Sequence, residues 1–309
     1  TGPGPGSGKL ATCLTMLYHD RMAGRPAGYA KFETFPVWDL PLRHPINLAY
    51  EAATADLGDI NMIDPFHLDA YGTVAVNYNR DVDAFPLLRE IWTRLDKSGE
   101  CPYRSPTDMG VNCISAGIID NAICTEAAKQ EVIRRYFRHL SDAVAKGASD
   151  KRPVELIDRL MHQLGLIPED RPVVVPARQA AQEASLSNTL EGVACGAALE
   201  LQDGTIVKGK NSTHLHAAAA TVLNAAKHLA GLPDERHLLA PETIASVMHM
   251  KQGILKGKYG SLNLDETLVA LAICAASDTN AKVALEKLAN LRDCEMHLSH
   301  MLTPGDEAG

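Results

Sequence analysis

The sequence lacks the features that mark membrane, secreted and nucleic-acid-binding proteins. No apolar run approaches the length of a transmembrane helix, and no signal peptide opens the chain. No run of Lys and Arg is present, and the formal net charge is -8, so neither nucleic acid nor an anionic membrane surface is an expected partner. These absences predict a cytoplasmic protein.

Cysteine motifs of metal and redox sites are also missing. The seven cysteines are odd in number and scattered, and no two of them form a C-x-x-C pair. This spacing argues against both a zinc ribbon and a thioredoxin-like site. Most of the cysteines lie in apolar segments, where they are expected to pack as small buried residues in a reducing compartment.

What is present is the composition of a globular protein with a sizeable core. The chain has 309 residues, 46% of them hydrophobic and 22% charged, which suffices for about two domains. In the first half, apolar spacing predicts a strand over 29–37 and several helices, one of which has Pro86 in its first turn. These helices are expected over residues 10–22, 47–57, 83–97, 125–147 and 154–164.

After Pro172 the pattern changes to strands and helices that alternate along the chain. Residues 193–201 alternate in size and polarity, which predicts a strand with one buried face, and Asp203-Gly204 predicts a hairpin turn after it. Residues 172–301 are therefore expected to form a mixed sheet flanked by helices. The later elements are expected at 217–230, 241–250, 264–276 and 280–291 for helices and 294–298 for a closing strand.

The most chemically distinctive feature is a glycine-rich loop before the first predicted helix. Glycines let successive backbone N–H groups, here those of Gly6, Gly8 and Lys9, converge on one anion, and the helix adds its positive end. The loop resembles G-x-x-x-x-G-K-[ST], but Pro3 stands at its first glycine and Leu10 at its hydroxyl position. The alternative is a tight turn with a solvated lysine. The predicted phosphate-binding residues are Gly4, Gly6, Ser7, Gly8, Lys9 and Thr12.

Polar side chains are concentrated in four further segments, residues 31–54, 59–69, 77–81 and 105–112. Polar loops interrupted by prolines commonly shape pockets, and Arg80 and Arg104 suit bidentate recognition of phosphate or carboxylate. The same residues are equally typical of exposed helix faces and capped surface turns. The predicted substrate pocket consists of Lys31, Glu33, Asn47, Glu51, Asp64, Asn79, Arg80, Thr107, Asp108 and Asn112.

Several long strings make the chain resemble a bacterial family named domain of unknown function 1846. They include GPGPGSGKLATCLTMLYH, VNYNRDV, SPTDMGVN and KQEVIRRYF. The resemblance covers the chain from Thr1 to about Met301. It implies a further N-terminal region that would supply the strand expected before the glycine loop, so the chain is expected to be the C-terminal three-fifths of such a protein.

The resemblance implies an α/β fold in three parts. These are a Rossmann-like domain remnant over 1–112, a helical insertion over 113–170 and a cytidine-deaminase-like α/β/α subdomain over 171–309. A zinc deaminase carries H-x-E or C-x-E at the helix that here follows His214-Leu-His216, and a later P-C-x-x-C. Neither is found at those places. We therefore expect no zinc and no deaminase chemistry in this subdomain.

Two functions remain open at this stage. One is an enzyme, such as a nucleotide-dependent transferase or ligase, that binds a nucleotide or phosphorylated small molecule at the glycine loop, with Mg²⁺ accompanying the nucleotide. The other is a non-catalytic ligand sensor or assembly protein, in which the deaminase-like part serves as a platform for homo-oligomers. The catalytic residues are unknown in either case.

Overall fold

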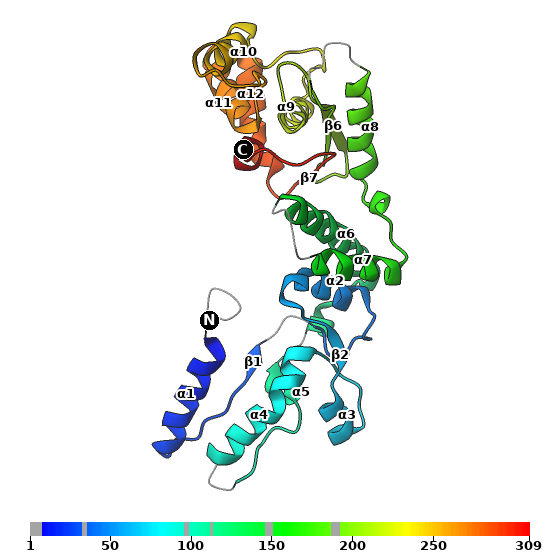
Figure 1. The fold of residues 1–309 in the computed structure, drawn as a ribbon, viewed down its shortest axis with the longest axis vertical. Helices are drawn as coiled ribbons and strands as arrows, with labels where there is room; N and C mark the ends of the chain where they lie inside the picture. The colour runs from blue at the N-terminus through cyan, green and yellow to red at the C-terminus, as the bar shows by residue number, and fades with distance from the viewer. Residues whose placement is uncertain (1–7, 33–35, 96–98, 112–113, 146–150, 187–191) are drawn as a thin grey trace. The chain divides into compact units, whose positions relative to one another are not determined.

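The computed structural model describes residues 8–32, 36–95, 99–111, 114–145, 151–186 and 192–309. Figure 1 shows a helix-rich α/β chain with small sheets. The chain forms two compact units, Thr1–Ile167 and Pro168–Gly309. None of the helices in the described part of the chain combines the length and apolar character that crossing a bilayer requires.

The first unit contains helices and two pairs of short strands. Its helices are α1 (Lys9–Met22), α2 (Pro45–Ala53), η1 (Ala55–Leu57), α3 (Pro65–Tyr71), α4 (Asn79–Leu95), α5 (Pro106–Met109), η2 (Ile114–Gly117), α6 (Asn121–Ala145) and α7 (Arg152–Leu164). Its strands are β1 (Lys31–Phe32), β2 (Asn61–Ile63), β3 (Val76–Tyr78) and β4 (Gly110–Val111). Strands β1 and β4 pair in parallel, whereas β2 and β3 pair antiparallel.

Two of the apolar clusters in this unit join its longer helices. Helices α2, α6 and α7 pack around Val132, Ile133 and Ile157, which are fully buried. Helices α1 and α4 meet around Phe85 and Trp92, also fully buried. The predicted helical spacing is confirmed for most of these residues, because apolar side chains of each segment lie in one of the two clusters, but Leu140 and Val144 at the end of α6 are exposed.

Two predictions for the first unit were wrong in detail. Pro86 lies inside α4 and not in its first turn, because the helix starts at Asn79, directly after β3. Since proline has no backbone N–H, the carbonyl of Val82 loses its helical hydrogen bond within α4. The strand expected over 29–37 is limited to Lys31–Phe32 among the described residues, and the Val37 N–H bonds to the side chain of Asn47 instead of a neighbouring strand.

The second unit has a three-stranded sheet between helices. Its strands are β5 (Gly196–Glu200), β6 (Ile206–Lys210) and β7 (Glu295–Leu298). Its helices are η3 (Pro168–Asp170), α8 (Val174–Ser185), α9 (Ala217–Leu229), α10 (Pro241–Met248), η4 (His249–Ile254), α11 (Leu264–Ala275), α12 (Thr279–Lys287), η5 (Leu288–Leu291) and α13 (Pro304–Ala308). The helices and strands expected after Pro172 are therefore confirmed.

The order of the sheet is β6-β5-β7, and both pairings are antiparallel. The predicted mixed sheet was wrong for the described residues. A hairpin joins β5 directly to β6, with Asp203-Gly204 in its turn as predicted, and β7 returns to the other edge of β5. In Figure 1, α8 and α9 lie on opposite sides of β6.

Strand β5 is buried on both faces, not on one as predicted. Ala198 packs with Val173 and Ala177 on the α8 side, whereas Ala197 packs with Ala217 on the α9 side. The small residues of β5 lie beneath a closely packed helix and do not face solvent. A Cβ built on Gly196 would stand 2.9 Å from the carbonyl carbon of Ala180 and closer still to two other backbone atoms of α8.

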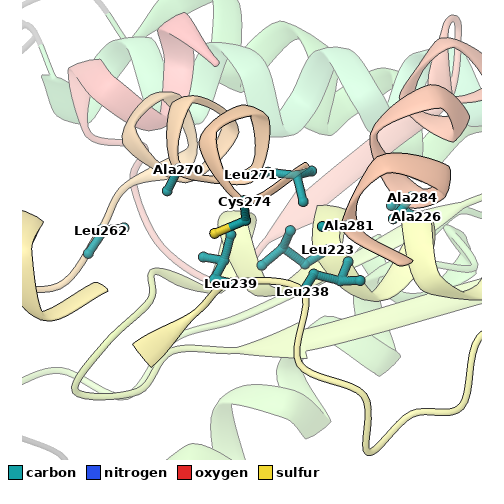
Figure 2. Close-up of a cluster of buried hydrophobic side chains, with 10 residues drawn as sticks. All are labelled: Leu223, Ala226, Leu238, Leu239, Leu262, Ala270, Leu271, Cys274, Ala281 and Ala284. Atoms are coloured by element: carbon teal, nitrogen blue, oxygen red, sulfur yellow. The ribbon is translucent and has the colours of Figure 1, made fainter. Parts of the chain in front are cut away.

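A second layer of helices covers α9. Figure 2 shows Leu223 and Ala226 of α9 together with Leu271 and Cys274 of α11. Leu238, Leu239, Leu262, Ala270, Ala281 and Ala284 complete this cluster. The alanine-rich face of α9 allows the neighbouring helices to approach closely, so this unit has a core on both sides of α9.

Candidate functional site

The glycine loop lies only partly within the described residues, because Gly4, Gly6 and Ser7 fall outside them. Gly8 is the N-cap of α1 and has φ 80°, a left-handed conformation that favours glycine. Its carbonyl accepts the N–H of Thr12 at 3.0 Å. No described side chain caps the helix, and its first turn holds no acidic residue. The positive end of α1 is therefore electrostatically suited to an anion.

The structure places two of the predicted pocket residues around one tyrosine, Tyr78, at the end of β3. Lys31 lies over the Tyr78 ring with its Nζ atom 4.6 Å from the centroid, and it donates hydrogen bonds to the Tyr78 hydroxyl and to Asp81. Arg80 approaches the same ring, with its Cζ atom 5.5 Å from the centroid. Two cations thus share one buried aromatic side chain.

A buried carboxylate holds Arg80 in place. Nη2 of Arg80 lies 2.7 Å from Oδ2 of Asp59, whose side chain is 1% exposed while that of Arg80 is 51% exposed. Burial alone would lower the pKa of Arg80, but the charge of Asp59 outweighs burial and raises it. Oδ1 of Asp59 has no hydrogen-bond partner among the described residues. The guanidinium is anchored by one edge, and its other donors remain available to solvent or a ligand.

The remaining described pocket residues support the backbone around this cluster. Asn79 accepts the N–H of Ile60 at 3.0 Å, and Asn47 accepts the N–H of Val37 at 2.7 Å. Glu51 accepts the N–H of Asn61 at 3.2 Å, and burial raises the pKa of Glu51 above its ordinary value. These side chains satisfy backbone donors inside the unit.

Asp64, Thr107 and Asp108 form a separate capping network. The fully buried Asp64 is the N-cap of α3 and also accepts hydrogen bonds from the Thr107 hydroxyl at 2.6 Å and the Thr107 N–H at 3.2 Å. Asp108 forms a capping box with Ser105 at α5 and accepts the hydroxyl of Tyr71. The polar string at 105–112 thus arises largely from helix capping. Glu33 and Asn112 lie outside the described residues.

A cavity of about 470 Å³ opens between α3, α4 and the segment before α5. None of the residues in the predicted pocket lines this cavity. Arg104 is the one lining residue that the sequence singled out, as a candidate anion clamp. The other lining residues come from α3, α4 and the segment 100–103, where apolar and charged side chains are mixed without any motif, so periodicity alone offers no signal for a pocket.

In the second unit, His216 occupies the N-cap position of α9, and its side chain pairs with a buried carboxylate. Its Nδ1 atom lies 2.7 Å from Oδ2 of Asp306. Asp306 also accepts the hydroxyl of Thr303 at 2.6 Å and the N–H of Leu264 at 3.0 Å. Burial alone would raise the pKa of Asp306, but the hydrogen bonds from His216 and Thr303 outweigh burial and lower it. Asp306 therefore ties α13 to the starts of α9 and α11.

Family models cover nearly the whole chain. Residues 1–165 match the model described as "Domain of unknown function DUF1846, N-terminal", and residues 169–309 match "Domain of unknown function DUF1846, C-terminal". The chain belongs to the DUF1846 family. The boundary between the two models falls where the two compact units of this DUF1846 chain divide.

Curated relatives carry the name "UPF0371 protein". The one from Corynebacterium aurimucosum is 52% identical over 307 residues, which are 99% of the DUF1846 chain and 59% of the relative. The one from Clostridium tetani is 48% identical and that from Clostridium botulinum (strain Alaska E43 / Type E3) 47% identical, each over 99% of the chain and 61% of the relative. The DUF1846 chain thus spans about three fifths of the length of these relatives.

We predict that the purified DUF1846 chain contains no stoichiometric zinc. One imidazole nitrogen of His216 faces Asp306, and no group of three or more His, Cys, Asp or Glu suited to a metal ion occurs in the part of the chain that the structure describes. Elemental analysis by mass spectrometry would test this. Zinc bound at a ratio near one and lost in His214→Ala or His216→Ala would contradict it.

Proposed function

We propose that the DUF1846 chain binds a phosphorylated small molecule or nucleotide through its first unit. The observation that carries this proposal is the pair of cations at Tyr78. Lys31 and Arg80 are positioned by Asp81 and Asp59, and Arg80 still presents donors that no described residue accepts. A planar guanidinium with one edge anchored and another exposed is suited to bidentate recognition of phosphate oxygens.

The start of α1 is the second element of the proposal. A helix of 14 residues whose first turn holds neither a capping side chain nor an acidic residue offers backbone N–H groups and the positive end of its dipole. Lys9 adds a charge at the first helical position. The convergence of the N–H groups of Gly6, Gly8 and Lys9 on one anion remains a prediction, because Gly6 lies outside the described residues.

The proposal concerns binding and includes no metal-dependent step. Mg²⁺ that accompanies a nucleotide usually contacts one or two protein carboxylates as well as the phosphates. The carboxylates nearest to the two cations, Asp59 and Asp81, are already paired with Arg80 and Lys31. A transferase or ligase activity would need a metal or a general base from elsewhere, so we propose binding and no reaction.

We also propose a deaminase-like fold for the second unit and a Rossmann-like fold for the first. The layers of α8, the sheet and α9, with a hairpin leading into the helix, support a deaminase-like arrangement in the second unit. For a Rossmann-like arrangement in the first unit, the support is the short parallel pair of β1 and β4. Neither arrangement implies an activity, because a fold hosts many functions.

We expect ATP to bind the 309-residue chain, and Lys9→Ala and Arg80→Lys each to weaken this binding at least about tenfold. A hydrogen bond between charged groups contributes roughly this much, and Arg80→Lys keeps the charge that Asp59 needs while removing the planar set of donors. Isothermal titration calorimetry with ATP measures the dissociation constants.

Arg25→Gln serves as the matched control for this experiment. Arg25 also forms an ion pair with an aspartate, Asp20, but lies at the other end of α1 from Lys9. Its replacement should leave ATP affinity unchanged. Failure of ATP to bind, or equal affinity in the Lys9 and Arg80 variants and the original chain, would refute the proposal.

A further inference from the structure

We propose that the cavity of the first unit is a second, separate binding site, which takes a small monocarboxylic acid with a flat apolar body. The cavity is lined by Phe66 of α3, Pro86 and Arg89 of α4, and Cys101, Tyr103 and Arg104 of the segment before α5. Its volume of about 470 Å³ lies within the range of small-molecule sites. Neither Lys31 nor Arg80 is among its lining residues.

Two arginines in the cavity wall are held by aromatic rings and not by carboxylates. The Cζ atom of Arg89 lies 5.9 Å from the ring centroid of Phe85, and that of Arg104 lies 5.0 Å from the centroid of Tyr71. Neither guanidinium forms a hydrogen bond or ion pair with any described residue. Arg94, one turn beyond Arg89 on α4, is instead paired with Glu90 at 2.9 Å. Stacking orients a guanidinium and leaves its N–H edge for a carboxylate.

The apolar wall of the cavity is rigid. The ring of Phe66 packs against that of Phe85, with centroids 4.9 Å apart, and the rings of Tyr103 and Trp92 form an edge-to-face pair with centroids 5.2 Å apart. The hydroxyl of Tyr103 donates to the carbonyl of Tyr29 and accepts its N–H at 2.8 Å. Since these contacts hold both rings in place, a flat apolar ligand can stack on them at little entropic cost.

Acidic residues in the lining restrict the charge of the ligand. Asp69, Glu90 and Glu100 line the same cavity as Arg89 and Arg104. Each carboxylate repels a bound anion, and the repulsion is about twice as large for a dianion as for a monoanion. The two arginines together with the three acidic residues therefore favour a carboxylate over a phosphate monoester. This preference distinguishes the cavity from the phosphate site proposed at Tyr78.

The test uses benzoate and the fluorescence of Trp92. The chain contains two tryptophans, so a Trp38→Phe background leaves Trp92, which contacts the cavity residue Tyr103, as the reporter. We expect a saturable change with benzoate, and a rise in its dissociation constant of at least about tenfold in Arg89→Gln and in Arg104→Gln. Arg25→Gln should leave the dissociation constant unchanged, because neither Arg25 nor its ion-pair partner Asp20 lines the cavity. Phenyl phosphate and benzyl alcohol should each bind more weakly than benzoate.

A second measurement guards against loss of structure in the Trp38→Phe background. In the unsubstituted chain, benzoate should slow alkylation of Cys101 by iodoacetamide, as followed by mass spectrometry, while alkylation of the exposed Cys13 continues at its original rate. The proposal is wrong if benzoate neither saturates the fluorescence nor protects Cys101. It is equally wrong if the two arginine variants bind like the original chain, or if phenyl phosphate binds more tightly than benzoate.

Discussion

Asp64→Ala is expected to lower the free energy of unfolding of the first unit by about 3–5 kcal/mol, the range typical of leaving buried charged or polar partners unpaired. The Asp64 carboxylate is fully buried and accepts the N–H groups of Phe66 and His67 at 2.9 and 3.0 Å as well as two hydrogen bonds from Thr107. Its removal leaves these four donors without their hydrogen-bond acceptor. Asp64→Asn retains one carboxamide oxygen and should lose less stability.

Urea unfolding followed by tryptophan fluorescence measures this loss. Both tryptophans, Trp38 and Trp92, lie in the first unit, so the signal reports that unit alone. The matched control is Asp69→Ala, which removes an exposed carboxylate from the same helix, α3, and should change the free energy of unfolding by less than about 0.5 kcal/mol. A loss near 0.5 kcal/mol for Asp64→Ala as well would show that the carboxylate is not the anchor described here.

Gly196→Ala is expected to destabilise the second unit by about 3 kcal/mol, the upper part of the range for overpacked cores. The added Cβ would enter backbone atoms of α8, including the carbonyl carbon of Ala180 at 2.9 Å. Backbone atoms cannot rotate aside as a flexible side chain does, so α8 must move away from the sheet. Burial of Ala198 against Val173 and Ala177 would be lost with it.

Far-UV circular dichroism against urea detects this change, while tryptophan fluorescence of the same sample should keep its original midpoint. Gly117→Ala provides a control, because a Cβ at Gly117 meets no atom within 4 Å. An unchanged dichroism transition in Gly196→Ala would mean that α8 does not pack on β5 as closely as described.

Local sequence pattern predicted much of the second unit but not all of it. In the second unit, the hairpin turn, the spacing of Leu223 and Ala226, and the closing strand near Met296 were all predictable, because local periodicity and turn chemistry decide them. The pairing of β7 with β5, and its antiparallel sense, was not predictable. It depends on how β7 returns to β5 across nearly a hundred residues, and no short-range pattern encodes that pairing.

For the candidate sites, the sequence determined which residues carry charge and which turns need glycine, whereas tertiary structure decided their roles. Asp64 and Arg80 both belong to segments that the sequence marks as candidate pocket walls, yet Asp64 is buried under backbone donors and Arg80 is half exposed over Tyr78. Arg89 was inconspicuous in its helix, yet it faces a cavity together with Arg104. Helical and strand periods follow from local backbone geometry, but burial, ion pairing and cavities arise from contacts between segments distant in sequence, which periodicity does not record.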